Sequence, residues 1–157
     1  EQHYQYDSSY IHELLDSSLE GYSRFSNFMS LNEFREKLST EEYWVAKLAA
    51  MQCEDCGECL QLNVRMALEA GLDRGLVKAV INNPSALPAA LQDLYRYAKH
   101  VASDETIEPD LVKRVLARYD KGHLLELGLC VATAKVFPTV KRAVGYTKSC
   151  SMICIDV

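Results

Sequence analysis

The sequence predicts a single all-α domain spanning residues 1–157, a bundle of about six to eight helices. Apolar residues recur at steps of three and four along nearly the whole chain, which is the spacing of one helix face. Only 7 Gly and 4 Pro are present, few for a chain rich in turns or strands. With 157 residues, 48% of them hydrophobic, the chain can bury one sizeable core. We find no linker or internal repeat.

The N-terminal third predicts three helical stretches. Apolar spacing indicates an amphipathic helix from Ser8 to Tyr22, and the pattern continues over residues 25–38 with a break near residues 30–32. Ser39, followed by Thr40 and two glutamates, is typical of a helix start, because a hydroxyl caps the first turn and acids there complement the helix dipole. That helix is expected to reach Met51.

The remainder also predicts helices, separated by Gly and Pro signals. A helix from Leu60 should end at Gly71, the usual terminator. We expect a kink or an interrupted backbone bond at Pro138, because proline lacks the N–H. Further helices are expected over residues 73–81, over 91–101, from Pro109 onward, and over 124–144 after a separation at 121–123.

Charge and hydropathy exclude two classes of partner. The net charge is −5 and no cluster of cations is visible, so we expect no nucleic-acid binding. The longest uncharged apolar run, Leu127–Ala134, is far below the ~20 residues that a membrane helix needs, so we expect no membrane span. With no signal segment visible, the expected location is cytoplasmic. The charge is unevenly distributed, with a net charge of −8 over residues 1–59 and +3 over residues 60–157. Complementary faces in a self-assembling protein would produce this difference, and so would chance.

Six cysteines are present, and half of them fall within seven residues. A structural disulfide framework spreads its cysteines to close long loops, so this clustering favours redox or metal chemistry instead. Cys56 and Cys59, separated by two residues at a helix start, can close a disulfide across one turn, and the free N–H groups there stabilise a thiolate. The acids Glu54, Asp55 and Glu58 oppose this effect, because negative charge beside a thiol raises its pKa.

Metal binding and simple burial are the alternatives for this cluster. Cys53, Cys56 and Cys59 resemble the start of an iron–sulfur run, but the fourth cysteine would fall at Asn63. Zinc would need the three thiolates and a distant ligand such as His100, His123 or Cys150. Buried cysteines behave as small hydrophobic residues. We expect this role for Cys130, and for Cys53 it is weighed equally with a chemical role. We expect no metal and no cofactor.

The motif and its flanks resemble the carboxymuconolactone decarboxylase and alkylhydroperoxidase D superfamily over about residues 35–146. The hallmark of that superfamily is C-x-x-C, then a His four residues later, a small residue and a helix-ending Gly. The matching positions here are Cys56, Cys59, Asn63, Ala67 and Gly71, with later similarity at residues 94–99 and 107–145.

This resemblance implies a compact helical fold that forms homo-oligomers, commonly trimers or hexamers. It also implies a thiol-dependent peroxidase or disulfide reductase acting on a small hydroperoxide or a protein disulfide, with a thiol electron donor. By position, Cys59 would attack the peroxide and Cys56 would resolve the sulfenic acid into a disulfide.

Two positions depart from the superfamily's proton relay. Its His is Asn63 here, and an amide cannot shuttle a proton near neutral pH as imidazole does. Its Glu, about twelve residues before the first cysteine, corresponds to Trp44. Glu41, one helical turn away on the same face, is the expected substitute and Glu42 a poorer one.

Other functions remain as alternatives. One is a carboxymuconolactone decarboxylase-like enzyme acting on a small acidic lactone through a polar pocket. Another is a non-catalytic oligomeric member whose relay has decayed, for which Asn63 and Trp44 argue. Cys150 and Cys154 are either a second redox pair that relays electrons or part of a packed tail. Of the histidines, His123 is the best candidate to reach the thiols.

Overall fold

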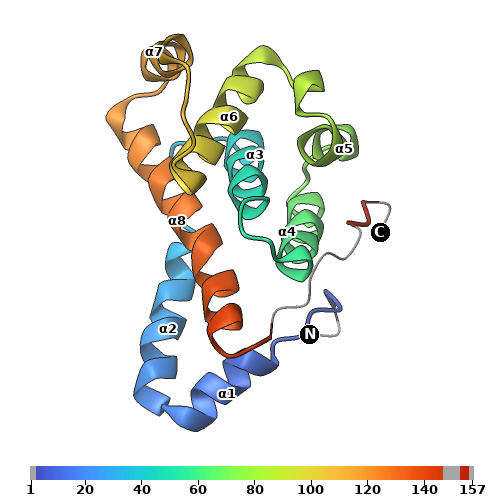
Figure 1. Cartoon of the computed structure of the whole chain (residues 1–157), viewed down its shortest axis with the longest axis vertical. Coiled ribbons are helices and arrows are strands. Elements are labelled where there is room, and N and C mark those ends of the chain that lie inside the picture. Colours follow the sequence, from blue (N-terminus) through green and yellow to red (C-terminus); the bar gives the residue numbers. More distant parts are fainter. Residues whose placement is uncertain (1–2, 147–152, 156–157) are drawn as a thin grey trace.

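The computed structural model describes residues 3–146 and 153–155. Within these residues the chain forms eight α-helices and one short 3-10 helix, with no strand, which confirms the all-α prediction (Figure 1). The elements are α1 (Ser9–Ser17), α2 (Leu19–Leu31), α3 (Thr40–Met51), α4 (Gly57–Glu69), α5 (Arg74–Asn82), η1 (Pro84–Ala86), α6 (Ala89–Ser103), α7 (Pro109–Arg118) and α8 (Lys121–Ala143).

Helix α3 is the centre of the fold and contacts α4, α5, α6 and α8 (Figure 1). Every residue from Tyr43 to Met51 is buried, so this helix is covered on all sides rather than amphipathic. Its start is the predicted one. Ser39 accepts from the N–H of Glu42, and the Glu42 carboxylate accepts in return from the N–H of Ser39. This capping box fixes where the chain enters the core.

The N-terminal helices differ from the prediction at two places. A single helix was expected from Ser8 to Tyr22, but Ser18 adopts an extended conformation, caps α2 by accepting from the N–H of Gly21, and so separates α1 from α2. The break near residues 30–32 is confirmed as the end of α2, but no helix follows it to Leu38. The reason is Glu126, whose carboxylate accepts from the N–H groups of residues 36, 37 and 38 and so holds them as a loop.

Helix α8 begins earlier than predicted and runs past its proline. Residues 121–123 were expected to separate two helices, but they form the first turn of α8, because the Asp120 carboxylate caps it by accepting from the N–H of His123. Pro138 lies inside α8, which continues to Ala143. The proline has no N–H to donate to the carbonyl of residue 134, so the expected backbone interruption is limited to that one bond.

By length and composition, α8 is the one helix among the described residues that would suffice to cross a membrane. The core helix of a soluble protein passes the same test. Here α8 contacts α3 and α6 and buries two charged residues, Glu126 and Lys141. The test therefore does not by itself indicate a membrane location.

Two peripheral segments complete the surroundings of α4. Helices α1 and α2 meet at a corner, with α2 beside the C-terminal half of α8 (Figure 1). Phe25 packs edge-to-face on Phe137 at 5.5 Å between ring centroids. The N-terminal residues lie along α4, because Arg65 donates to the carbonyl of Tyr4 and the Tyr4 hydroxyl donates to Glu69. The N-terminal segment also reaches the start of α4, where the Tyr6 hydroxyl lies 3.8 Å from the Sγ of Cys59.

Candidate thiol site at the start of α4

The paired cysteines lie at the first turn of α4. Cys56 is the residue that precedes the helix, and Cys59 is its third residue. Their Sγ atoms are at disulfide distance, 2.23 Å, and their Cα atoms are 5.3 Å apart. The side chain of Cys56, which occupies the N-cap position, makes no capping hydrogen bond. N–H groups in the first turn of a helix can stabilise negative charge on a nearby sulfur. Both residues are buried, with exposed fractions of 6% and 2%.

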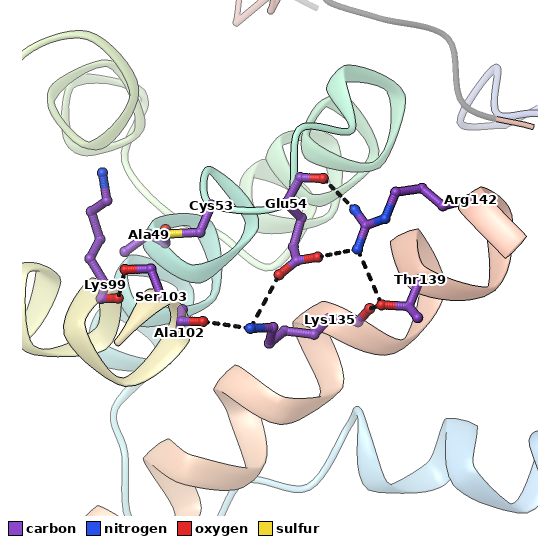
Figure 2. A network of polar contacts seen from close by, with 9 residues as sticks. All are labelled: Ala49, Cys53, Glu54, Lys99, Ala102, Ser103, Lys135, Thr139 and Arg142. Atoms are coloured by element: carbon purple, nitrogen blue, oxygen red, sulfur yellow. Dashed lines mark hydrogen bonds and ion pairs between the residues drawn. The ribbon is translucent and has the colours of Figure 1, made fainter. Parts of the chain in front are cut away.

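The turn that leads into the cysteines is held by a polar network around Glu54 (Figure 2). Its carboxylate, 5% exposed, lies 2.8 Å from Arg142 and 3.6 Å from Lys135, both on α8. Arg142 also donates to the backbone carbonyl of Glu54 at 2.6 Å, and Lys135 donates to the carbonyl of Ala102 on α6. The network ties the α3–α4 turn to α8 and α6. This turn includes Asp55, whose φ of +45° is unusual for a residue other than glycine.

A second ion pair lies inside the motif itself. Lys141, 1% exposed, pairs with the carboxylate of Glu58 at 2.9 Å. The acids beside the cysteines were expected to raise the thiol pKa. Two of the three, Glu54 and Glu58, are paired with cations of α8. This pairing removes much of the expected opposition to thiolate formation, and it gives a physical role to the excess of cations in the C-terminal part of the chain.

Tyr6, on the N-terminal segment, is a polar residue that contacts the cysteine pair. Its hydroxyl lies 3.8 Å from the Sγ of Cys59 and 3.3 Å from the hydroxyl of Tyr10. The ammonium of Lys141 lies over the Tyr6 ring, 4.6 Å from its centroid. Burial raises the pKa of Tyr6, so the hydroxyl keeps its proton at neutral pH. The Tyr6 hydroxyl donates this proton to Tyr10, and by turning toward Cys59 it can donate it instead to a sulfur that bears no proton.

A cavity of about 250 Å³ lies between α1, α2, α3, α4, α8 and the N-terminal segment. Cys59 forms part of its wall, and Cys56 does not. The lining is mostly apolar and aromatic, with Tyr10, Met29, Met51, Leu62, Met66 and Phe137 among its residues. A small molecule in this cavity would meet Cys59 first.

The other predicted site residues lie at different distances from this chemistry. Asn63 is buried in the cavity wall, where its amide donates to the backbone carbonyl of Cys59 at 2.8 Å. Glu41 is exposed in the first turn of α3 and does not line the cavity. Trp44 is buried in the core and packs edge-to-face on Tyr43. The cavity therefore brings Asn63 to Cys59 but does not include Glu41.

The other described cysteines, Cys53, Cys130 and Cys154, are not bonded to the pair. Cys130 is buried on α8, and burial raises its pKa to about 12. Cys53 is half-buried, and its thiol donates to the carbonyl of Ala49 at 3.6 Å (Figure 2). Cys154 is exposed and lies against α4, where Gln61 bonds its backbone N–H and carbonyl. Cys150, its expected partner, lies outside the described residues.

The described residues hold no group of three or more His, Cys, Asp and Glu side chains placed to bind a metal ion. His123, expected to reach the thiols, instead bonds Asp120 at 2.9 Å at the start of α8. His100 bonds the carbonyl of Glu105. Neither histidine lines the cavity beside Cys59.

Three residues near the pair escaped the sequence analysis. Tyr6 lies outside the motif and reaches Cys59 only through the path of the N-terminal segment. Lys47 carried a sequence signal, because it is a charged residue that interrupts the otherwise apolar run from Tyr43 to Met51. Lys141 is followed by Arg142, so its burial is not visible in the sequence.

Comparison with known proteins gives no match, since no family model, curated protein or solved structure is significantly similar to this chain. The family resemblance therefore rests on the sequence pattern alone.

Proposed function

We propose that this chain is a thiol-dependent oxidoreductase of the alkylhydroperoxidase D type that reduces small hydroperoxides with its Cys56 and Cys59 pair. One observation carries this proposal. Cys59 is within bonding distance of Cys56 and also forms part of the wall of a mostly apolar cavity. A sulfur that can both form a disulfide and meet a small molecule has the two contacts that thiol peroxidation requires.

The reaction balances with these two sulfurs and an external donor. The thiolate of Cys59 attacks the peroxide ROOH, takes its terminal oxygen to become a sulfenic acid, and releases RO⁻, which takes up a proton as ROH. The thiol of Cys56 then displaces water from the sulfenic acid, and the disulfide forms. A dithiol donor restores both thiols by exchange and leaves as its own disulfide. Tyr6, at 3.8 Å from Cys59, is placed to hydrogen-bond the thiolate.

The burial of the pair favours a small substrate over a protein disulfide. The exposed fractions of 6% and 2% leave little room for a protein surface to bring its own sulfurs to Cys56 or Cys59. The cavity provides a route for a molecule of a few heavy atoms without any movement of the helices. A protein or small dithiol donor would have to displace the N-terminal segment or enter by the same cavity.

The proposal includes self-association into a homo-oligomer, a trimer or hexamer, as the resemblance implies. Leu125 and Leu129 lie one turn apart on α8 and are 71% and 36% exposed. Apolar side chains at this spacing form a stripe that a second copy would cover. Light scattering on the purified protein measures the number of subunits.

Trapping the sulfenic acid tests the role assigned to each sulfur. In Cys56→Ser the resolving thiol is absent, so one equivalent of cumene hydroperoxide should leave a sulfenic acid on Cys59 that dimedone labels, located by peptide mass. In Cys59→Ser the same treatment should leave position 56 unlabelled.

The matched control is Cys130→Ser, which removes a cysteine that is buried and separate from the pair. It should form the disulfide between Cys56 and Cys59 at the wild-type rate. Dimedone on Cys56 in the Cys59→Ser protein, or on neither sulfur in either variant, would overturn the assignment.

A further inference from the structure

Lys47 has an unusual environment for a lysine. Its side chain lies inside the core and is 2% exposed. The ammonium donates to Thr133 Oγ1 at 2.7 Å, to the carbonyl of Cys130 at 3.3 Å and to the amide oxygen of Asn32. All three acceptors are neutral, and no carboxylate of the described residues lies within ion-pair distance of it. Its positive charge is therefore buried without a counter-ion, which is a costly arrangement.

This uncompensated cation faces the cavity that contains Cys59. Lys47 and Asn63 lie in the same cavity wall, and Thr133 and Asn32 line it as well. Among the described residues that line the cavity, the only other charged side chain is Glu33, which is exposed at the end of α2. The interior of the cavity therefore combines an apolar lining, one cation and one reactive sulfur.

We propose that this cavity binds a small apolar monocarboxylate whose carboxylate pairs with Lys47. If the proposed peroxidase function holds, the substrate class is a hydroperoxide that carries a carboxylate; this part of the inference rests on the proposed function. An entering carboxylate would supply the missing counter-ion and take the place of the Asn32 amide oxygen. A dry apolar cavity of about 150 Å³ holds benzene. The larger volume here, about 250 Å³, suits a ring or a short chain with one carboxylate.

Binding of two probes of nearly equal size tests the proposal without any turnover. Benzoate carries the carboxylate and benzamide is its neutral analogue. On the oxidised wild-type protein at pH 7, calorimetry should give a dissociation constant for benzoate at least about tenfold lower than for benzamide. Lys47→Met should lose this preference and still bind benzamide. Lys113→Met, which changes an exposed lysine on α7, should keep it.

A measurement on the wild type alone covers the case in which Lys47→Met fails to fold. Burial lowers the pKa of Lys47 to about 8, so the affinity for benzoate should fall about tenfold from pH 7 to pH 9 as the ammonium loses its proton. The other titratable groups facing it are Tyr43 on α3, Cys130 on α8, Glu33 after α2, and Tyr4, Tyr6 and Tyr10. The tyrosine and cysteine pKa values among them are raised, so these groups keep their protons through pH 9.

Equal affinity for the two probes, no saturable binding of benzoate, or a benzoate affinity unchanged at pH 9 would each overturn the inference. The proposed function fails separately. If hydroperoxide still closes the disulfide between Cys56 and Cys59 while benzoate is not preferred, only the substrate class is wrong. If benzoate is preferred and no disulfide forms, the cavity binds carboxylates and the thiol chemistry is wrong.

Discussion

Two lysines of this protein are buried to nearly the same degree, and they differ in what surrounds their charge. Lys141 is 1% exposed and pairs with the carboxylate of Glu58, while its ammonium also lies over the rings of Tyr6 and Tyr10. Lys47 is 2% exposed; its ammonium donates to neutral oxygens and lies 5.9 Å from the centroid of the Tyr43 ring, and no carboxylate of the described residues pairs with it. Lys141 is therefore neutralised by Glu58, a residue next to Cys59. Lys47 has no counter-ion in the described part of the chain, and we propose that the carboxylate of a bound ligand pairs with it.

The largest expected effect comes from breaking the compensated pair. Glu58→Gln keeps the shape of the side chain but leaves the ammonium of Lys141 buried without a counter-ion. Removing one partner of a fully buried ion pair costs about 3 kcal/mol or more, but Glu58 is 29% exposed, so we expect urea unfolding to show a loss of about 2–3 kcal/mol. Glu20→Gln, which breaks the exposed pair with Arg24, is the control and should change stability little. A Glu58→Gln protein as stable as that control would show that the pair does not hold the site.

Lys47, which has no counter-ion, should make the free energy of unfolding depend on pH. The pKa of Lys47 is about 8 in the folded protein against an ordinary value of 10.5. Between these values the unfolded chain holds a proton that the folded chain has released, so the free energy of unfolding rises with pH. This group alone should add about 2 kcal/mol between pH 7 and pH 9.5.

The measurement is the difference in stability between wild type and Lys47→Met across that pH range, because the other titrating groups cancel in the difference. The free energy of unfolding of the wild type should increase relative to that of Lys47→Met as the pH rises. A difference that is flat with pH would place the pKa of Lys47 at its ordinary value and remove the contrast with Lys141.

The smallest expected effect concerns Tyr6, which links Lys141 to the reactive sulfur. Tyr6→Phe removes the hydroxyl 3.8 Å from Cys59 and keeps the ring under the ammonium. Loss of one hydrogen bond of about 1 kcal/mol should slow oxidation of Cys59 by hydroperoxide about fivefold, measured by stopped flow. Tyr10→Phe removes a hydroxyl that contacts Tyr6 rather than the sulfur, and should have a smaller effect. Equal rates for both variants would contradict a direct role for Tyr6.

The local features of the fold were predictable because they depend on neighbouring residues. The helix start with its hydroxyl cap at Ser39 and the all-α class were both predicted from the sequence pattern and are confirmed. The loop over residues 32–39 was not predictable. It depends on Glu126, which lies about ninety positions further along the chain and satisfies the N–H groups of that loop.

The site divides in the same way. The proximity of Cys56 and Cys59 follows from one helical turn, and their spacing alone indicated it. The neutralisation of Glu54 and Glu58 depends on α8, and the approach of Tyr6 depends on the path of the N-terminal residues, so neither was visible in the motif. Glu41 lies in the exposed first turn of α3 and does not line the cavity. Its role in a proton relay stays a prediction.

The most direct test of the central claim is to map the state of each cysteine after oxidation. Fully reduced protein is treated with one equivalent of cumene hydroperoxide, alkylated, digested and weighed by mass spectrometry. We predict one product, a peptide containing a disulfide between Cys56 and Cys59, with Cys53 and Cys130 alkylated once the protein is unfolded. A protein in which Cys56 and Cys59 remain free thiols while the hydroperoxide persists would contradict the account.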